Sequence, residues 1–103
     1  MQTLHYRFPA DMRPARAAHT GTVASGDLEV LLAPPTANTG YAEVRVRTSA
    51  DGFDTVWHEA LERFFARVPL AGDWEVNDSG ATPGVVALRL RQAAEAATVQ
   101  EQP

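Results

Sequence analysis

Apolar and polar residues alternate along two stretches of this chain, which is the pattern of strands with one buried face. Leu4, Tyr6 and Phe8 alternate with polar neighbours near the N-terminus, and residues 41–48 repeat the arrangement. In the second stretch the polar positions are glutamate and arginine. Both stretches therefore predict strands of a sheet whose other face is exposed to water.

Two shorter apolar segments, at about residues 17–24 and 28–32, flank Gly26 and Asp27. A two-residue connection that contains glycine favours a β-hairpin, because glycine adopts positive φ without steric cost. The pattern predicts that Ser25 lies at the tip of this hairpin. The prolines and glycine of residues 33–40 predict a loop after it.

Helical spacing begins after Asp51 and Gly52. Asp54 or Thr55 is the predicted N-cap, and Pro69 is predicted to end the helix. The apolar residues follow at spacings of four, three and four, which places them on one helical face. This face consists of Trp57, Leu61, Phe64 and Val68.

A short strand at Trp74 and Val76 is predicted next, followed by a turn over residues 77–80 and a second helix over 83–97. Thr82 is the expected cap of that helix, with Pro83 at its first position. The apolar alternation from Val86 to Leu90 also fits a strand, so the start of this segment stays open. The predicted buried face consists of Val86, Leu90, Ala93, Ala94 and Ala97.

These elements predict an α+β fold: a small, mostly antiparallel sheet of about five strands with two helices packed on one face. We expect a single domain over residues 1–97 and a disordered tail over 98–103. No apolar run is long enough to span a membrane, and the N-terminus lacks the features of a signal peptide. The expected location is therefore cytoplasmic.

Composition narrows the possible chemistry. The 103 residues include no cysteine, which excludes disulfides, thiolate metal sites and cysteine nucleophiles. All nine basic residues are arginine, so lysine-based chemistry is excluded as well. The net charge is −4 and the arginines form no basic stripe, which argues against nucleic-acid binding.

Most polar side chains have a structural interpretation. His5, His19 and His58 lack the spacing of metal ligands, and no metal site is expected. Asp51 with Asp54, or Glu59 with Glu62, are the possible carboxylate pairs. The second pair is best interpreted as part of a solvated helix face, and catalytic pairing requires a pocket that the sequence does not show.

Ser25 is the remaining candidate. It lies in no G-x-S-x-G motif and has no adjacent base in the sequence, so a hydrolase nucleophile is disfavoured. A hydroxyl on a turn is, however, a suitable point for covalent attachment. The alternative is an ordinary turn residue in a small binding module that carries no prosthetic group.

Three stretches, residues 23–31, 61–67 and 74–90, resemble the acyl carrier protein, or delta subunit, of malonate decarboxylase. They occur in the same order and span nearly the whole chain. The acyl carrier subunit of citrate lyase is a more distant look-alike and remains the alternative within the carrier class. Fatty-acid-type carriers differ, because in them the serine follows an aspartate at the start of a helix.

The resemblance implies that Ser25 carries 2′-(5″-phosphoribosyl)-3′-dephospho-coenzyme A through a phosphodiester bond. The thiol of that group would hold acetyl and malonyl thioesters while malonate is converted to acetate and CO2. Gly26 and Asp27 would shape the supporting turn, and the carrier itself would contribute no catalytic residue. The implied partners are the acyl-transferase (alpha) subunit, the decarboxylase (beta and gamma) subunits, a prosthetic-group transferase and a malonyl transferase for priming.

Overall fold

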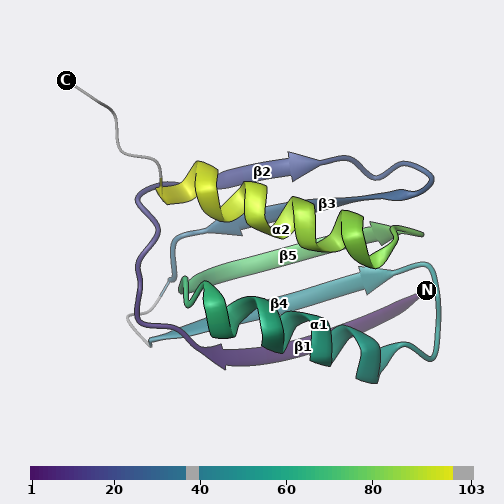
Figure 1. The fold of residues 1–103 in the computed structure, drawn as a ribbon, viewed down its shortest axis with the longest axis horizontal. Coiled ribbons are helices and arrows are strands. Elements are labelled where there is room, and N and C mark those ends of the chain that lie inside the picture. Colours follow the sequence, from purple (N-terminus) through teal and green to yellow (C-terminus); the bar gives the residue numbers. More distant parts are fainter. Residues whose placement is uncertain (37–39, 99–103) are drawn as a thin grey trace.

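The computed structural model describes residues 1–36 and 40–98. Within these ranges five strands form one sheet in the order β1-β4-β5-β3-β2, and two helices cover one of its faces (Figure 1). Neighbouring strands are antiparallel except β4 and β5, which are parallel. The predicted α+β fold is therefore confirmed. The elements are β1 (Gln2–Pro9), β2 (Ala18–Gly21), β3 (Asp27–Ala33), β4 (Tyr41–Thr48), α1 (Asp54–Arg67), β5 (Gly72–Ser79) and α2 (Pro83–Thr98).

The hydrophobic core lies between the sheet and the two helices. Alternate residues of β3, β4 and β5 point toward the helices, as the period of two requires. The buried face of α2 is confirmed, and its three alanines allow the helix to lie close to β2 and β3. The fully buried positions include Leu28, Val30, Val46, Leu61, Leu70, Val76, Ala93 and Ala97.

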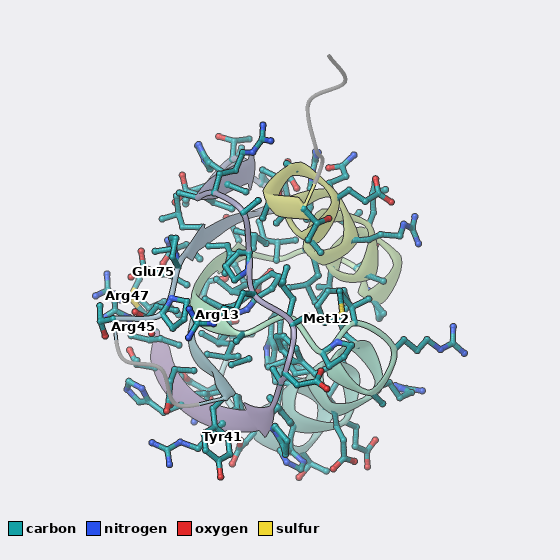
Figure 2. All side chains as sticks on the ribbon, turned by 90° about the vertical axis from the view of Figure 1, so that its left-hand side faces the viewer. Met12, Arg13, Tyr41, Arg45, Arg47 and Glu75 are labelled. Carbon is teal, nitrogen blue, oxygen red and sulfur yellow. The ribbon has the colours of Figure 1, made fainter. Side chains whose placement is uncertain are left out.

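The other face of the sheet carries charged side chains. Figure 2 shows Arg45, Arg47 and Glu75 on the side of the sheet away from the helices. Arg45 forms an ion pair with Glu75, and Arg7 forms another with Glu43 at 2.6 Å. This arrangement confirms the prediction that residues 41–48 form a strand with one face exposed to water.

The helix starts were only partly predicted. Phe53, rather than Asp54 or Thr55, occupies the N-cap of α1, and no side chain caps this helix. Asp54 instead lies in the first helical turn, where its carboxylate accepts a hydrogen bond from the Tyr6 hydroxyl. The predicted cap of α2 is confirmed: the Val85 N–H donates to Thr82 Oγ1 at 3.4 Å, and the segment that follows is a helix from its first residue.

The predicted turn over residues 77–80 was wrong. β5 continues to Ser79, because β3 and β4 pair with it on both sides and fix its last residues in extended conformation. Asp78 pairs with Thr48 of β4, and Ser79 pairs with Asp27 of β3. Only Gly80, with φ +79°, departs from the strand. The predicted tail lies outside the described residues except for Thr98, which belongs to α2.

Candidate functional site

Ser25 lies in the connection between β2 and β3, at the right-hand end of the sheet in Figure 1. The Asp27 N–H donates to the Ala24 carbonyl at 2.9 Å, which closes a four-residue turn. Gly26 has φ +81°, whereas no non-glycine residue in the described ranges has positive φ. A turn with positive φ at its third position alone is type II, and that position favours glycine. Ser25 and Gly26 are therefore the central residues of the turn.

This geometry confirms the hairpin and corrects its boundaries. The predicted turn consisted of Gly26 and Asp27, but Asp27 is already the first residue of β3. β2 ends earlier than predicted, at Gly21, where it pairs with Glu29. The connection therefore comprises residues 22–26, and Ser25 lies within its closing turn.

The surroundings of Ser25 are open. Ser25 and Gly26 are both exposed, and the Ser25 hydroxyl forms no hydrogen bond with any part of the chain that the structure describes. A Cβ built on Gly26 would meet no atom within 4 Å. Open space therefore lies beside the hydroxyl, and no side chain among the described residues is hydrogen-bonded to it as a base would be.

Asp27 links the turn to α2. Arg89 Nε donates to Asp27 Oδ1 at 3.1 Å, and Arg89 Nη2 donates to Oδ2 at 3.0 Å. The Leu28 N–H also donates to Oδ1, at 2.7 Å. The Arg89 hydrogen bond, supported by that backbone donor, holds the pKa of the Asp27 carboxylate below its usual range. Asp27 is therefore ionised at neutral pH, with both oxygens engaged in holding the turn.

Three further contacts fix the base of the hairpin. The Gly26 N–H donates to the Ser79 carbonyl at 2.8 Å, which joins the turn to the end of β5. The Thr20 hydroxyl donates to the Arg89 carbonyl at 2.9 Å. A Cβ on Gly21 would lie 1.9 Å from the Leu28 carbonyl oxygen, so β2 closes tightly on β3 just before the connection. Ser25 is thus exposed on a support that is held from two sides.

Sequence reasoning did not find Arg89, Ser79 or Gly21 as supports of this turn. Arg89 lies 62 positions from Asp27, and no local pattern links the two. The sequence offered one indication of this contact, the opposite charges of the two side chains. Arg89 is a cation on a predicted helix, and Asp27 is an anion next to a predicted strand.

The other candidate groups have separate structural roles. His19 contacts Glu29 at 2.9 Å on the open sheet face, and the His58 ring packs against Tyr6 and Phe8. Asp51 lies 3.9 Å from the N-terminal amine. Among the residues placed by the structure, no group of three potential ligands could hold a metal ion. No helix formed by these described residues is long and apolar enough to cross a membrane.

Residues 15–97 match the family described as "Malonate decarboxylase delta subunit (MdcD)". The chain belongs to this family. A malonate decarboxylase acyl carrier protein of Pseudomonas fluorescens is 46% identical over 96 residues, covering 92% of this chain and 95% of that protein. Its counterpart in Azotobacter vinelandii is 47% identical, with the same coverage of both chains.

A solved structure gives the same result at the level of the fold. A chain in the crystal structure of a Pseudomonas malonate decarboxylase hetero-tetramer in complex with malonate superposes with a TM-score of 0.86 and 43% identity. The match covers 93% of this chain and 98% of that chain. The resemblance inferred from the three sequence stretches is confirmed, and within the carrier class the malonate decarboxylase family is favoured over that of citrate lyase.

Proposed function

We propose that this protein serves malonate decarboxylase as a carrier whose point of covalent attachment is Ser25. Family membership supports the carrier role. The observation that supports Ser25 is its position: an exposed hydroxyl without a hydrogen-bond partner among the described residues, on a turn held by β5 and α2. The attached group is proposed to be 2′-(5″-phosphoribosyl)-3′-dephospho-coenzyme A.

The residues around Ser25 fit a bulky phosphodiester-linked group. Gly26 leaves open space beside the hydroxyl, since no atom lies within 4 Å of a Cβ built there. The nearest carboxylate in sequence, Asp27, is neutralised by the bidentate contact with Arg89. An added phosphate therefore finds open space beside Gly26, and the carboxylate next to it in sequence is already paired with Arg89.

Attachment would require an enzyme, because no described side chain is hydrogen-bonded to the Ser25 hydroxyl to take its proton. The Ser25 oxygen would serve as the nucleophile toward a phosphorus of the donor, which must be activated as a phosphoanhydride so that a phosphate can leave. A bond would form between Ser25 Oγ and phosphorus, the bond from phosphorus to the leaving phosphate oxygen would break, and the hydroxyl proton would pass to a base of the attaching enzyme. Within this step the carrier positions the hydroxyl, and its turn determines the direction of approach.

When bound, the group supplies a thiol that holds acetyl and malonyl as thioesters, whose carbonyl stabilises the charge that develops on loss of CO2. The chain contributes tethering: a fixed anchor keeps the acyl group at high effective concentration near successive active sites. Those sites are proposed to belong to the alpha acyl-transferase and the beta and gamma decarboxylase subunits. A prosthetic-group transferase and a malonyl transferase for priming complete the set. The carrier itself is proposed to be non-catalytic.

Turnover of a reconstituted malonate decarboxylase complex tests this proposal. Ser25→Ala should abolish conversion of malonate to acetate while leaving the thermal unfolding midpoint unchanged, because the exposed hydroxyl forms no hydrogen bond with the described residues. Ser49→Ala is the matched control, since Ser49 is also exposed and lies in a connection, and it should turn over normally. Wild-type turnover by the Ser25→Ala complex would refute the proposal.

A further inference from the structure

An apolar groove lies at the same end of the molecule as Ser25. β3 begins at this end, β4 and β5 end there, and α1 and α2 both begin there (Figure 1). The groove has a volume of about 300 Å³ and lies between the first turns of the two helices. Its apolar lining includes Phe53, Val56, Trp57, Ala81, Pro83 and Val86.

The polar atoms of this groove already have partners. The Thr48 hydroxyl donates to Asp78 Oδ2 at 2.9 Å, and Asp78 Oδ1 accepts the Ala81 N–H at 3.0 Å. Thr48 Oγ1 also accepts the Ala50 N–H at 3.2 Å. The groove therefore favours an apolar occupant, because a polar one would lose hydration without gaining a free partner.

Phe53 is an unusual residue at the start of a helix. An N-cap favours Ser, Thr, Asp or Asn, yet Phe53 occupies this position with no capping hydrogen bond and with 48% of its surface exposed. Val56, in the first turn, is 54% exposed. Folding gains little from either side chain, and exposed apolar residues gathered beside a groove are typical of a contact surface.

The charges near these residues are acidic. Asp51 is 77% exposed, and the N-terminal amine lies 3.9 Å from its Oδ1. Asp54 follows Phe53 directly and accepts a hydrogen bond from neutral Tyr6, so its charge is not compensated there. An apolar groove with acidic neighbours complements a protein face that carries an apolar side chain among basic residues.

We propose that the groove between α1 and α2, with Phe53 and Val56 at its rim, docks the enzyme that attaches the prosthetic group to Ser25. This inference rests on the proposed function. An enzyme that forms a bond to Ser25 Oγ must cover this end of the carrier, whereas an enzyme that acts at the far end of a long arm is not so constrained. An enzyme that binds a multiply phosphorylated donor also needs basic residues around its active site.

The test measures attachment kinetics with the purified unmodified carrier and the prosthetic-group transferase of the same host, followed by intact-mass spectrometry. Phe53→Asp should raise the KM for the carrier by about tenfold, the loss expected for one aromatic contact at an interface. The kcat at saturating carrier should stay within about twofold, because Ser25 itself is untouched. Val56→Asp should act in the same direction.

Phe53→Asp also separates docking from folding. Aspartate is tolerated at helix starts, and Phe53 is half exposed, so this variant should stay folded with an unfolding midpoint within a few degrees of the wild type even as its attachment weakens. Met12→Asp is the matched control, because Met12 is 47% exposed and lies at the opposite end of the molecule (Figure 2). Its KM should equal that of the wild type.

Two results would contradict the docking proposal, and a third would remove the function on which it rests. Modification of folded Phe53→Asp and Val56→Asp carriers with the wild-type KM would overturn it. Unchanged attachment combined with weaker binding to the alpha, beta or gamma subunits would overturn it too, and would assign the groove to those subunits. Failure of the wild-type carrier to be modified at Ser25 would instead remove the proposed function itself.

Discussion

Replacing Gly21 with alanine should disturb the support of Ser25 more than any other single methyl group added to the hairpin. Gly21 has φ +74°, where a side chain is strained, and its Cβ would lie 1.9 Å from the Leu28 carbonyl oxygen. Real Cβ atoms essentially never come within 3.0 Å of a non-bonded heavy atom. The Leu28 carbonyl oxygen belongs to the backbone, so it cannot move aside as the end of a flexible side chain could. The strands must therefore separate for the substituted chain to fold.

The expected cost has two parts. A non-glycine residue in the left-handed region costs about 1–2 kcal/mol. Separation of β2 from β3 near the Gly21–Glu29 pair weakens backbone hydrogen bonding, at about 1–3 kcal/mol for a group left unsatisfied. We expect a total of about 2–5 kcal/mol, which lowers the unfolding midpoint by about 4–8 °C per kcal/mol in a domain of this size.

Gly26→Ala is the matched control, because Gly26 has a similar φ of +81° but no atom within 4 Å of the added Cβ. It should show only the backbone cost, about 1–2 kcal/mol. Chemical denaturation of both variants gives the two free energies of unfolding directly. Equal losses in Gly21→Ala and Gly26→Ala would refute the close approach of β2 to Leu28.

Two further predictions concern α2 and its contact with the turn. Gly84→Ala should stabilise the protein by about 0.5–1 kcal/mol in denaturant titrations, because Gly84 lies inside α2 and a Cβ there meets nothing within 4 Å. Asp27→Asn should lower the unfolding midpoint at neutral pH. The folded pKa of Asp27 lies below its ordinary value of 3.8, so this carboxylate stabilises the fold above that value and loses its effect as pH falls through the folded pKa. The gap between wild type and Asp27→Asn should therefore close in strongly acidic solution, and a gap independent of pH would contradict the contact with Arg89.

Much of the fold was predictable because burial on one face imposes a period on the sequence. Alternation revealed β1 and β4, and the spacing of apolar residues revealed both helices. Thr82 and Pro83 indicated a helix start, but the alternation from Val86 to Leu90 left a strand possible until the structure showed the helix. In each case local preference and tertiary burial favour the same structure.

The errors arose where tertiary contacts outweigh local preference. Asn77 and Asp78 favour turns, but pairing with strands on both sides extends β5 through them. Asp54 is a good cap, but its carboxylate is bonded to Tyr6 of β1 and Phe53 takes the cap position. The turn that holds Ser25 was recognised from Gly26 and Asp27, whereas its connections to Arg89 and Ser79 depend on the assembled fold.

The central claim is that Ser25 is the covalent anchor of a carrier, and mass spectrometry of the protein purified from its native host tests it most directly. The intact chain from an active malonate decarboxylase complex should be heavier than its sequence mass by one phosphoribosyl-dephospho-coenzyme A group. Fragmentation should place the added mass on Ser25, and a Ser25→Ala chain from the same host should carry none. An unmodified Ser25 in a fully active complex, or the group on another residue, would contradict the account.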